Sequence, residues 1–73
     1  MKVRVVEVGK NIKLDQLLKF SGIVSTGGEA KRAIQLGRVR VNGHPVIQRG
    51  YKPKDGDLVE LEGKEIIRVK VIK

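Results

Sequence analysis

The chain has 73 residues, a formal net charge of +8 and no cysteine. A chain of this length forms one domain with a small hydrophobic core. The absence of cysteine excludes disulfides, thiolate metal sites and thiol nucleophiles, and a single histidine, His44, cannot form a histidine metal cage within one chain. No apolar run approaches the ~20 residues that cross a bilayer, and the N-terminus lacks the pattern of a signal peptide. We therefore expect a soluble, cytoplasmic protein.

The first strand and the first helix are predicted from a change in the spacing of apolar residues. Residues 2–8 are rich in valine, which is typical of a short strand. From Ile12 to about Ser21 the apolar spacing becomes helical, and Gly22 is a suitable C-terminal stop for that helix. Phe20 lies near the leucines of this helix, so we expect its ring to be packed in the core.

A second helix is predicted to begin directly after Thr26. Thr26 as the N-cap, with Glu29 three residues later, fits the capping-box pattern. Ala30 and Ile34 belong to an apolar stripe that contains small residues, which allow another backbone to approach closely. Gly37 is expected to end the helix.

The second half of the chain predicts strands joined by tight turns. Residues 38–41 alternate with period two, so both arginines should share one face and both valines the other. Asn42-Gly43 is a strong signal for a hairpin turn, and Pro45 begins the return. Two further strands are expected at 57–61 and 65–72, which gives the element order β-α-α-β-β-β.

The positive charge is concentrated in the middle of the chain. No acidic residue lies between Glu29 and Asp55. The cations of this acid-free stretch are Lys31, Arg32, Arg38, Arg40, Arg49, Lys52 and Lys54. Because soluble chains tend to intersperse their charges, we interpret the stretch as a face for an acidic partner, with nucleic acid the first candidate and an anionic membrane the second. A solvated face with chance clustering is the alternative.

The start of the second helix is the first candidate site. Gly27 and Gly28 fall where backbone N–H groups lack intrahelical partners and the helix dipole is positive, which favours a phosphate. Two adjacent glycines suggest that another molecule comes close to the backbone, and an ordinary capped helix explains them equally well. The pattern is not a nucleotide-binding P-loop, because no Gly-Lys-Ser/Thr is present.

The exposed face of the second helix is the second candidate site. Gly28, Arg32 and Gln35 stand at i, i+4 and i+7, with Lys31 and Arg38 beside them. Arginine grips phosphate with two hydrogen bonds, and glutamine reaches a sugar or a base edge. A solvated helix face is the alternative, but the positive charge continues into Arg40 and favours contact.

The remaining polar and aromatic residues indicate which kind of nucleic acid the protein binds and whether it is an enzyme. Asn42 and His44 at the hairpin turn could contact RNA, although such residues more often build the turn itself. Phe20 and Tyr51 are the only aromatics, whereas proteins that bind unstructured single strands stack bases on several aromatic rings. This scarcity favours recognition of folded RNA by shape and backbone. No set of nucleophile, base and orienting group is present by residue type, so we expect no enzyme activity.

Taken together, the residues over about 12–61 resemble the S-four RNA-binding domain, or alpha-L motif. The matching residues are Lys13-Leu14-Asp15, Leu18, Gly22, Ser25-Thr26, Glu29-Ala30, Ile34, Gly37, Val39, Val41-Asn42-Gly43, Val46 and Gly56-Asp57. The resemblance implies an α+β fold in which two helices pack on a small, mainly antiparallel sheet and grip RNA together with the adjoining hairpin. It also implies a bacterial, ribosome-associated setting, with ribosomal or transfer RNA as the target.

The resemblance also implies which residues contact RNA. The family contact positions that match this chain are Lys13, Ser25, Thr26, Lys31, Arg32, Gln35, Arg38 and Arg40. The family often has arginine just after the Ser/Thr of the second helix, where this chain has Gly27. We expect backbone N–H groups at Gly27 and Gly28 to take the place of that arginine.

These observations predict that residues 1–73 form a single, monomeric, non-enzymatic domain that binds structured RNA. No cofactor, metal, membrane or small-molecule substrate is expected. Two alternatives stay open. A protein-interaction adaptor would use the acidic segment 55–65 or the edges of the valine-rich terminal strands. A duplex-DNA binder would need more base-reading side chains on one helix than Arg32 and Gln35 provide.

Overall fold

The computed structural model of the chain describes residues 3–48 and 50–72. Lys2 of the first predicted strand and Arg49 of the acid-free stretch lie outside the described residues. The elements are β1 (Val3–Gly9), α1 (Leu14–Phe20), α2 (Gly27–Gln35), β2 (Val39–Val41), β3 (His44–Pro45), β4 (Leu58–Leu61) and β5 (Ile66–Ile72). The predicted order is confirmed, and the short strand β3 is added to it.

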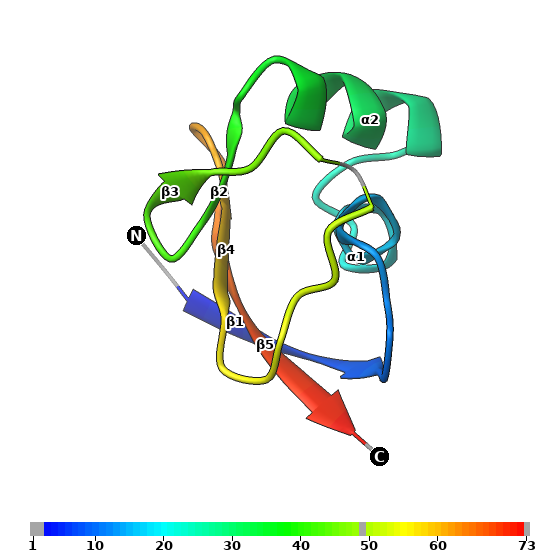
Figure 1. Cartoon of the computed structure of the whole chain (residues 1–73), viewed down its shortest axis with the longest axis vertical. Helices are drawn as coiled ribbons and strands as arrows, with labels where there is room; N and C mark the ends of the chain where they lie inside the picture. Colours follow the sequence, from blue (N-terminus) through cyan, green and yellow to red (C-terminus); the bar gives the residue numbers. More distant parts are fainter. Residues whose placement is uncertain (1–2, 49, 73) are drawn as a thin grey trace.

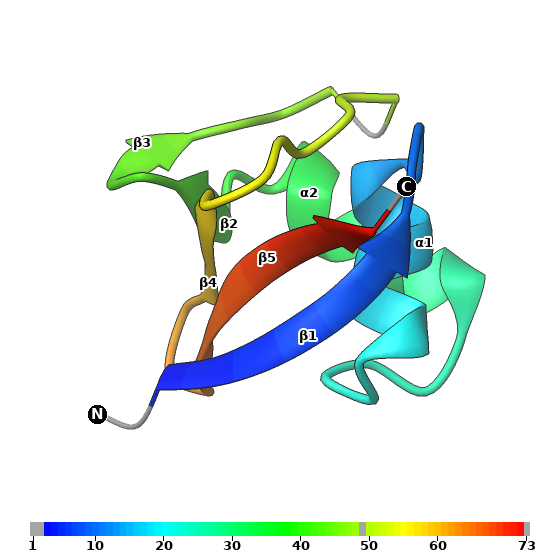
Figure 2. The same cartoon turned by 90° about the horizontal axis from the view of Figure 1, so that it is seen from below.

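The five strands form one mixed sheet in the order β1-β5-β4-β2-β3 (Figure 1). Three of the four pairings are antiparallel, as the sequence predicted. The exception is the pairing of the two terminal strands, which run parallel from Val3 opposite Ile66 to Gly9 opposite Ile72. Figure 2 shows these two long strands side by side. The strands from the two ends of the chain therefore form one edge of the sheet.

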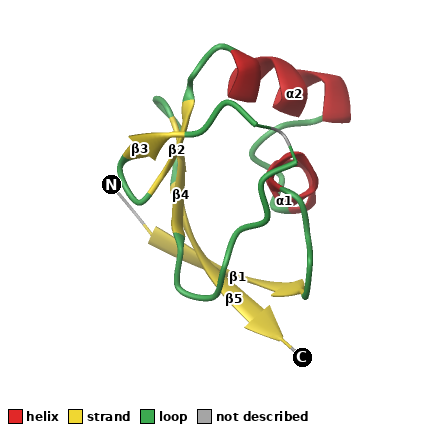
Figure 3. Ribbon diagram, viewed as in Figure 1, coloured by secondary structure: helices red, strands yellow, loops and turns green. Residues whose placement is uncertain are grey.

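Both helices lie on one side of the sheet, which makes a two-layer α+β fold (Figure 3). Strands β2, β4 and β5 alternate between more and less buried residues, as a sheet covered on one face requires. Val39 and Val41 of β2 are buried while Arg40 between them is exposed, which confirms the predicted alternation. The core comprises Val8, Leu14, Leu17, Leu18, Ile23, Val24, Ala30, Ile34, Val39, Val41, Val59, Leu61, Ile67 and Val69.

The first helix is shorter than the pattern over residues 12–21 predicted, and its last residue is not in the core. Leu14, Leu17 and Leu18 are fully buried and fix which face of α1 meets the sheet. Phe20 falls outside that stripe, and 67% of its surface is exposed. The expectation that Phe20 is packed is therefore wrong, because nearness in sequence to the leucines does not place it on their helix face.

The Thr26 half of the predicted capping box of α2 is present, whereas the Glu29 side chain makes no reciprocal bond to the described Thr26 backbone. The Thr26 hydroxyl oxygen accepts a hydrogen bond from the Glu29 N–H at 3.1 Å. Ala30 and Ile34 are the buried residues of α2 and form the face of the helix that packs against the core. Neither described helix is long and apolar enough to cross a membrane.

Candidate nucleic-acid interface

The α2 N-terminus presents two glycines that the protein's own packing does not require. Gly27 and Gly28 are the first helical residues, and a Cβ at either position would meet no atom within 4 Å. The backbone angles of neither are left-handed, so an alanine would fit both. Glycine weakens a helix relative to alanine, and no contact of the described fold requires it at either position.

The outward face of α2 carries the predicted polar side chains. Lys31, Arg32 and Gln35 are all exposed, and Ala30 and Ile34 on the opposite face are buried. Successive residues on a helix are about 100° apart, so Lys31 and Arg32 point to different sides of this face. Arg32 is on the side toward the sheet, where it lines a groove, and Lys31 is not among the groove's lining residues.

Arg38 is held in place by the C-terminal cap of α2. Gly37, with φ of +74°, donates its N–H to the Ile34 carbonyl at 3.0 Å, and Arg38 donates its N–H to the Ala33 carbonyl at 3.0 Å. These two bonds form a Schellman motif. The Arg38 carbonyl then accepts the Glu62 N–H at 3.0 Å. The backbone of Arg38 is therefore fixed between α2 and the end of β4, while its side chain is exposed.

The groove beside α2 has a volume of about 340 Å³ and brings Arg32 and Arg38 together. Its lining residues are Val24, Glu29, Arg32, Ala33, Leu36, Arg38, Leu61, Glu62 and Lys64. Lys64 is a cation that the sequence patterns did not single out. Glu29 and Glu62 also line the groove, so its rim carries both signs of charge.

The hairpin after α2 carries Arg40 on the solvent face of the sheet. Arg40 is opposite Pro45 on β3 and opposite Glu60 on β4. The hairpin turn has φ of +53° at Asn42 and +85° at Gly43. Two successive positive φ angles define a type I′ turn, which matches the twist of the strands and confirms the turn that Asn-Gly predicted.

Asn42 has a structural role, because its side chain joins the hairpin to β4. Its amide oxygen accepts the Leu58 N–H at 3.0 Å, and its amide nitrogen donates to Asp57 at 3.1 Å. Asp57 also accepts the Tyr51 hydroxyl at 3.1 Å and the Lys54 N–H at 2.8 Å. Burial raises the pKa of Tyr51 above its ordinary value, and the hydrogen bond to Asp57 adds to this. Asp57 and Tyr51 are therefore positioning residues of the hairpin.

Lys13 and Ser25 are predicted site residues that precede α2 and do not line the groove. Lys13 is the exposed N-cap residue of α1, and its N–H donates to the Gln16 side chain at 3.1 Å. Ser25 is exposed in the connector just before the α2 cap. Ser25 therefore lies next to the α2 N-terminus in the chain, whereas Lys13 lies at the start of α1.

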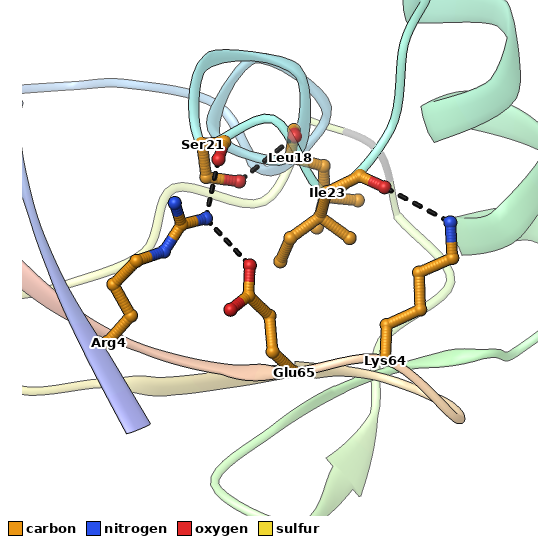
Figure 4. Close-up of polar contacts among 6 residues, drawn as sticks. All are labelled: Arg4, Leu18, Ser21, Ile23, Lys64 and Glu65. Atoms are coloured by element: carbon orange, nitrogen blue, oxygen red, sulfur yellow. Dashed lines mark hydrogen bonds and ion pairs between the residues drawn. The ribbon is translucent and has the colours of Figure 1, made fainter. Parts of the chain in front are cut away.

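Residues distant in sequence hold the connector between the two helices through hydrogen bonds to its backbone carbonyls (Figure 4). Arg4 of β1 donates to the Ser21 carbonyl and also pairs with Glu65 at 2.8 Å. Lys64 donates to the Ile23 carbonyl at 3.2 Å. These contacts hold the segment that leads into the α2 N-terminus, so β1 and the turn between β4 and β5 help to position the candidate site.

The cations divide into two groups according to their partners. In the described part of the chain, ion pairs join Arg4 to Glu65 and Lys70 to Glu7. No side-chain hydrogen bond or ion pair with a described residue is made by Lys31, Arg32, Arg38 or Arg40. We call Lys31, Arg32, Gln35, Arg38 and Arg40 the basic face. Its charges are free to meet an external anion.

The S4 domain family model matches residues 5–70. The chain belongs to the S4 domain family. The match extends beyond residues 12–61 and includes most of both terminal strands. The fold of this S4 domain, with two helices on one side of a mixed sheet, agrees with the family that its sequence resembled.

Three relatives of this S4 domain place it among proteins of different lengths. It is 36% identical over 77% of its length to small ribosomal subunit protein uS4 of Rhodopirellula baltica, and spans 28% of that protein. It is 44% identical over 75% of its length to an uncharacterized RNA pseudouridine synthase of Aquifex aeolicus, and spans 23% of it. It is 42% identical over 71% of its length to the probable ribosome maturation protein RlbA of Bacillus subtilis, and spans 73% of it.

Proposed function

We propose that this S4 domain is a non-enzymatic module that binds structured RNA through the basic face and the α2 N-terminus. The observation that carries the proposal is that the four cations of the basic face gather around α2 and β2 and make no side-chain bond to a described residue, whereas Arg4, Lys64 and Lys70 each have an internal partner. Family membership and relatives named for the ribosome, its maturation and RNA modification support RNA binding in general.

Each part of the surface suits a different contact. Arg32 and Arg38, which line one groove, suit bidentate contacts to phosphates on neighbouring nucleotides. Gln35 suits a sugar or a base edge. The free N–H groups at Gly27 and Gly28 suit one further phosphate, with the Ser25 and Thr26 hydroxyls beside it. Lys13, Lys31 and Arg40 extend the positive field around these contacts.

Ribosomal RNA is the target class that the relatives favour, with transfer RNA second. Two of the three relatives are named as a ribosomal protein and a ribosome maturation protein. The exposed α2 face and type I′ hairpin are preformed, which suits docking on a folded RNA surface. We propose that the domain acts as a monomer in the cytoplasm, with RNA or the ribosome as its partner.

Matched RNA and DNA hairpins of one sequence test the proposal. We expect the RNA hairpin to bind more tightly, and we expect Arg32→Ala or Arg38→Ala to weaken RNA binding about tenfold, the scale of one hydrogen-bonded charge contact. Arg68→Ala is the matched control, because it removes the same charge from β5, and Arg68 does not line the groove that holds Arg32 and Arg38. Equal losses in all three variants would refute the basic face, and preference for DNA would favour the duplex-DNA alternative.

The protein-adaptor alternative keeps one supporting observation. Strand β1 is at the edge of the sheet, and its Val3 and Val5 are exposed, which is a surface suited to strand addition. The acidic segment is less suited, because Asp55, Asp57 and Glu65 already accept internal hydrogen bonds. A protein partner that is recovered after nuclease treatment would support this alternative.

A further inference from the structure

Phe20 is an exposed aromatic ring on a helix whose orientation is fixed. It is the most exposed of the large hydrophobic residues that the structure describes, at 67%. The buried leucines of α1 prevent the helix from turning Phe20 inward. Leaving an aromatic ring in water forgoes a large burial free energy, so its exposure calls for a reason.

The surroundings of Phe20 combine apolar surface with positive charge. Phe20, Ile12, Gln16 and Lys19 line a shallow groove of about 420 Å³. Gln16 and Phe20 are spaced i and i+4, which brings both to one side of α1, and Lys13 is the N-cap residue just before the helix. In the described part of the chain neither Lys13 nor Lys19 takes part in an ion pair.

The only acid of α1 does not neutralise this groove. Asp15 is half-buried, and its carboxylate accepts the Gln16 N–H at 2.8 Å. The Gln16 side-chain oxygen accepts the Lys13 N–H at 3.1 Å, and the Gln16 NH₂ group donates to no described residue. The groove therefore offers a flat ring, an amide donor and a cation in one place, and this set is complementary to a base and its phosphate.

We propose that the α1 groove binds an unpaired base of the RNA, with the base stacked on Phe20. Lys19 then meets the adjoining phosphate, and the Gln16 amide donates to a base edge. The inference rests on the proposed function and extends it, because it adds a single-stranded feature, such as a bulge, to the folded RNA that the basic face binds. An apolar protein segment fits less well, since it offers no negative charge to the lysines.

The test uses two synthetic RNA hairpins with one stem. One hairpin carries a single bulged adenosine, and the other carries an abasic residue at the same position, so the two differ only in the base. We expect the wild-type chain to bind the bulged hairpin about tenfold more tightly, within the range of one base–aromatic stack. Phe20→Ala and Phe20→Leu should lose this preference, whereas Phe20→Trp should keep it. The chain has no tryptophan of its own, so quenching of the introduced indole reports stacking directly.

Salt dependence separates stacking from charge in the same experiment. Phe20→Ala should leave the slope of log K against log salt unchanged. Lys19→Ala should reduce the magnitude of the slope by about the amount that one neutralised phosphate contributes. Equal binding of both hairpins by the wild type, or wild-type behaviour of Phe20→Leu, would overturn the stacking site while the RNA-binding function stands. Failure of the wild type to bind either hairpin would instead refute the proposed function. A nuclease-resistant protein partner lost in Phe20→Ala would assign the groove to protein.

Discussion

Arginines and lysines have different roles in two regions of this small domain, the connector between the helices and the basic face. At the connector, Arg4 pairs with Glu65 and the Ser21 carbonyl, and Lys64, which also lines the groove, donates to the Ile23 carbonyl. On the basic face, Arg32 and Arg38 have fixed backbones but make no side-chain bond to a described residue. The two regions therefore differ in whether the cationic side chains already have internal partners.

Polar contacts made by residues outside the basic face help to position α2 and the hairpin, which carry the basic face. Arg4 and Lys64 anchor the connector that leads to the α2 N-terminus, and Asp57 holds the hairpin that carries Arg40. Stability and binding are therefore expected to respond to different substitutions. The following predictions test that separation, beginning with the largest effect.

Asp57→Ala is expected to cost the most stability. It removes hydrogen bonds from Asn42, Tyr51 and Lys54, so the free energy of unfolding should fall by about 2–3 kcal/mol. Urea denaturation followed by circular dichroism measures the loss. Glu60→Ala is the control, because Glu60 is half-buried on β4 and accepts no hydrogen bond from a described residue. A loss as large in Glu60→Ala would mean that Asp57 is not the organising residue.

Arg4→Ala is expected to destabilise the fold less. The variant loses one carbonyl hydrogen bond and one partly exposed ion pair, together worth about 1 kcal/mol. Arg68→Ala removes an equal charge with no described partner, and should change the unfolding free energy by less than ~0.5 kcal/mol. If the two variants had equal stability in urea, internal pairing would not distinguish the two groups of cations.

Tyr51→Phe is expected to have the smallest effect at neutral pH and a distinct dependence on pH. Loss of the bond to Asp57 should lower stability by about 0.5–1.5 kcal/mol at pH 7. The raised pKa means that the folded state favours the neutral phenol, so this contribution is present below about pH 10 and is lost as pH rises through the raised pKa. Urea unfolding from pH 7 to 11 should show the variant and the wild type converging. A constant gap would contradict the assignment.

Local features of this fold were predictable from the sequence because neighbouring residues determine them. The Thr26 cap, the Gly37 stop and the Asn42-Gly43 turn all depend on contacts within a few residues. The burial pattern of β2 followed from its period of two. The candidate residues of α2 were therefore assigned to the correct helix and to its exposed face.

The remaining features depend on contacts between distant parts of the chain. Lys64 meets Ile23 across 41 residues, and Arg4 meets Glu65 across 61, so no local pattern marks them as anchors of the connector. The exposure of Phe20 depends on which face of α1 the sheet covers, and the parallel pairing of the terminal strands depends on closure of the whole chain. The link from Asn42 to Asp57 likewise joins two separate turns.

The salt dependence of RNA binding tests the central claim most directly. The slope of log K against log salt should fall in magnitude by roughly 0.7–0.9 for each of Arg32→Ala and Arg38→Ala, because each variant leaves one phosphate without its cation. Arg4→Ala and Arg68→Ala should keep the wild-type slope. Unchanged slopes in Arg32→Ala and Arg38→Ala, or an equal fall in Arg68→Ala, would contradict a binding surface made from the unpaired cations of α2 and β2.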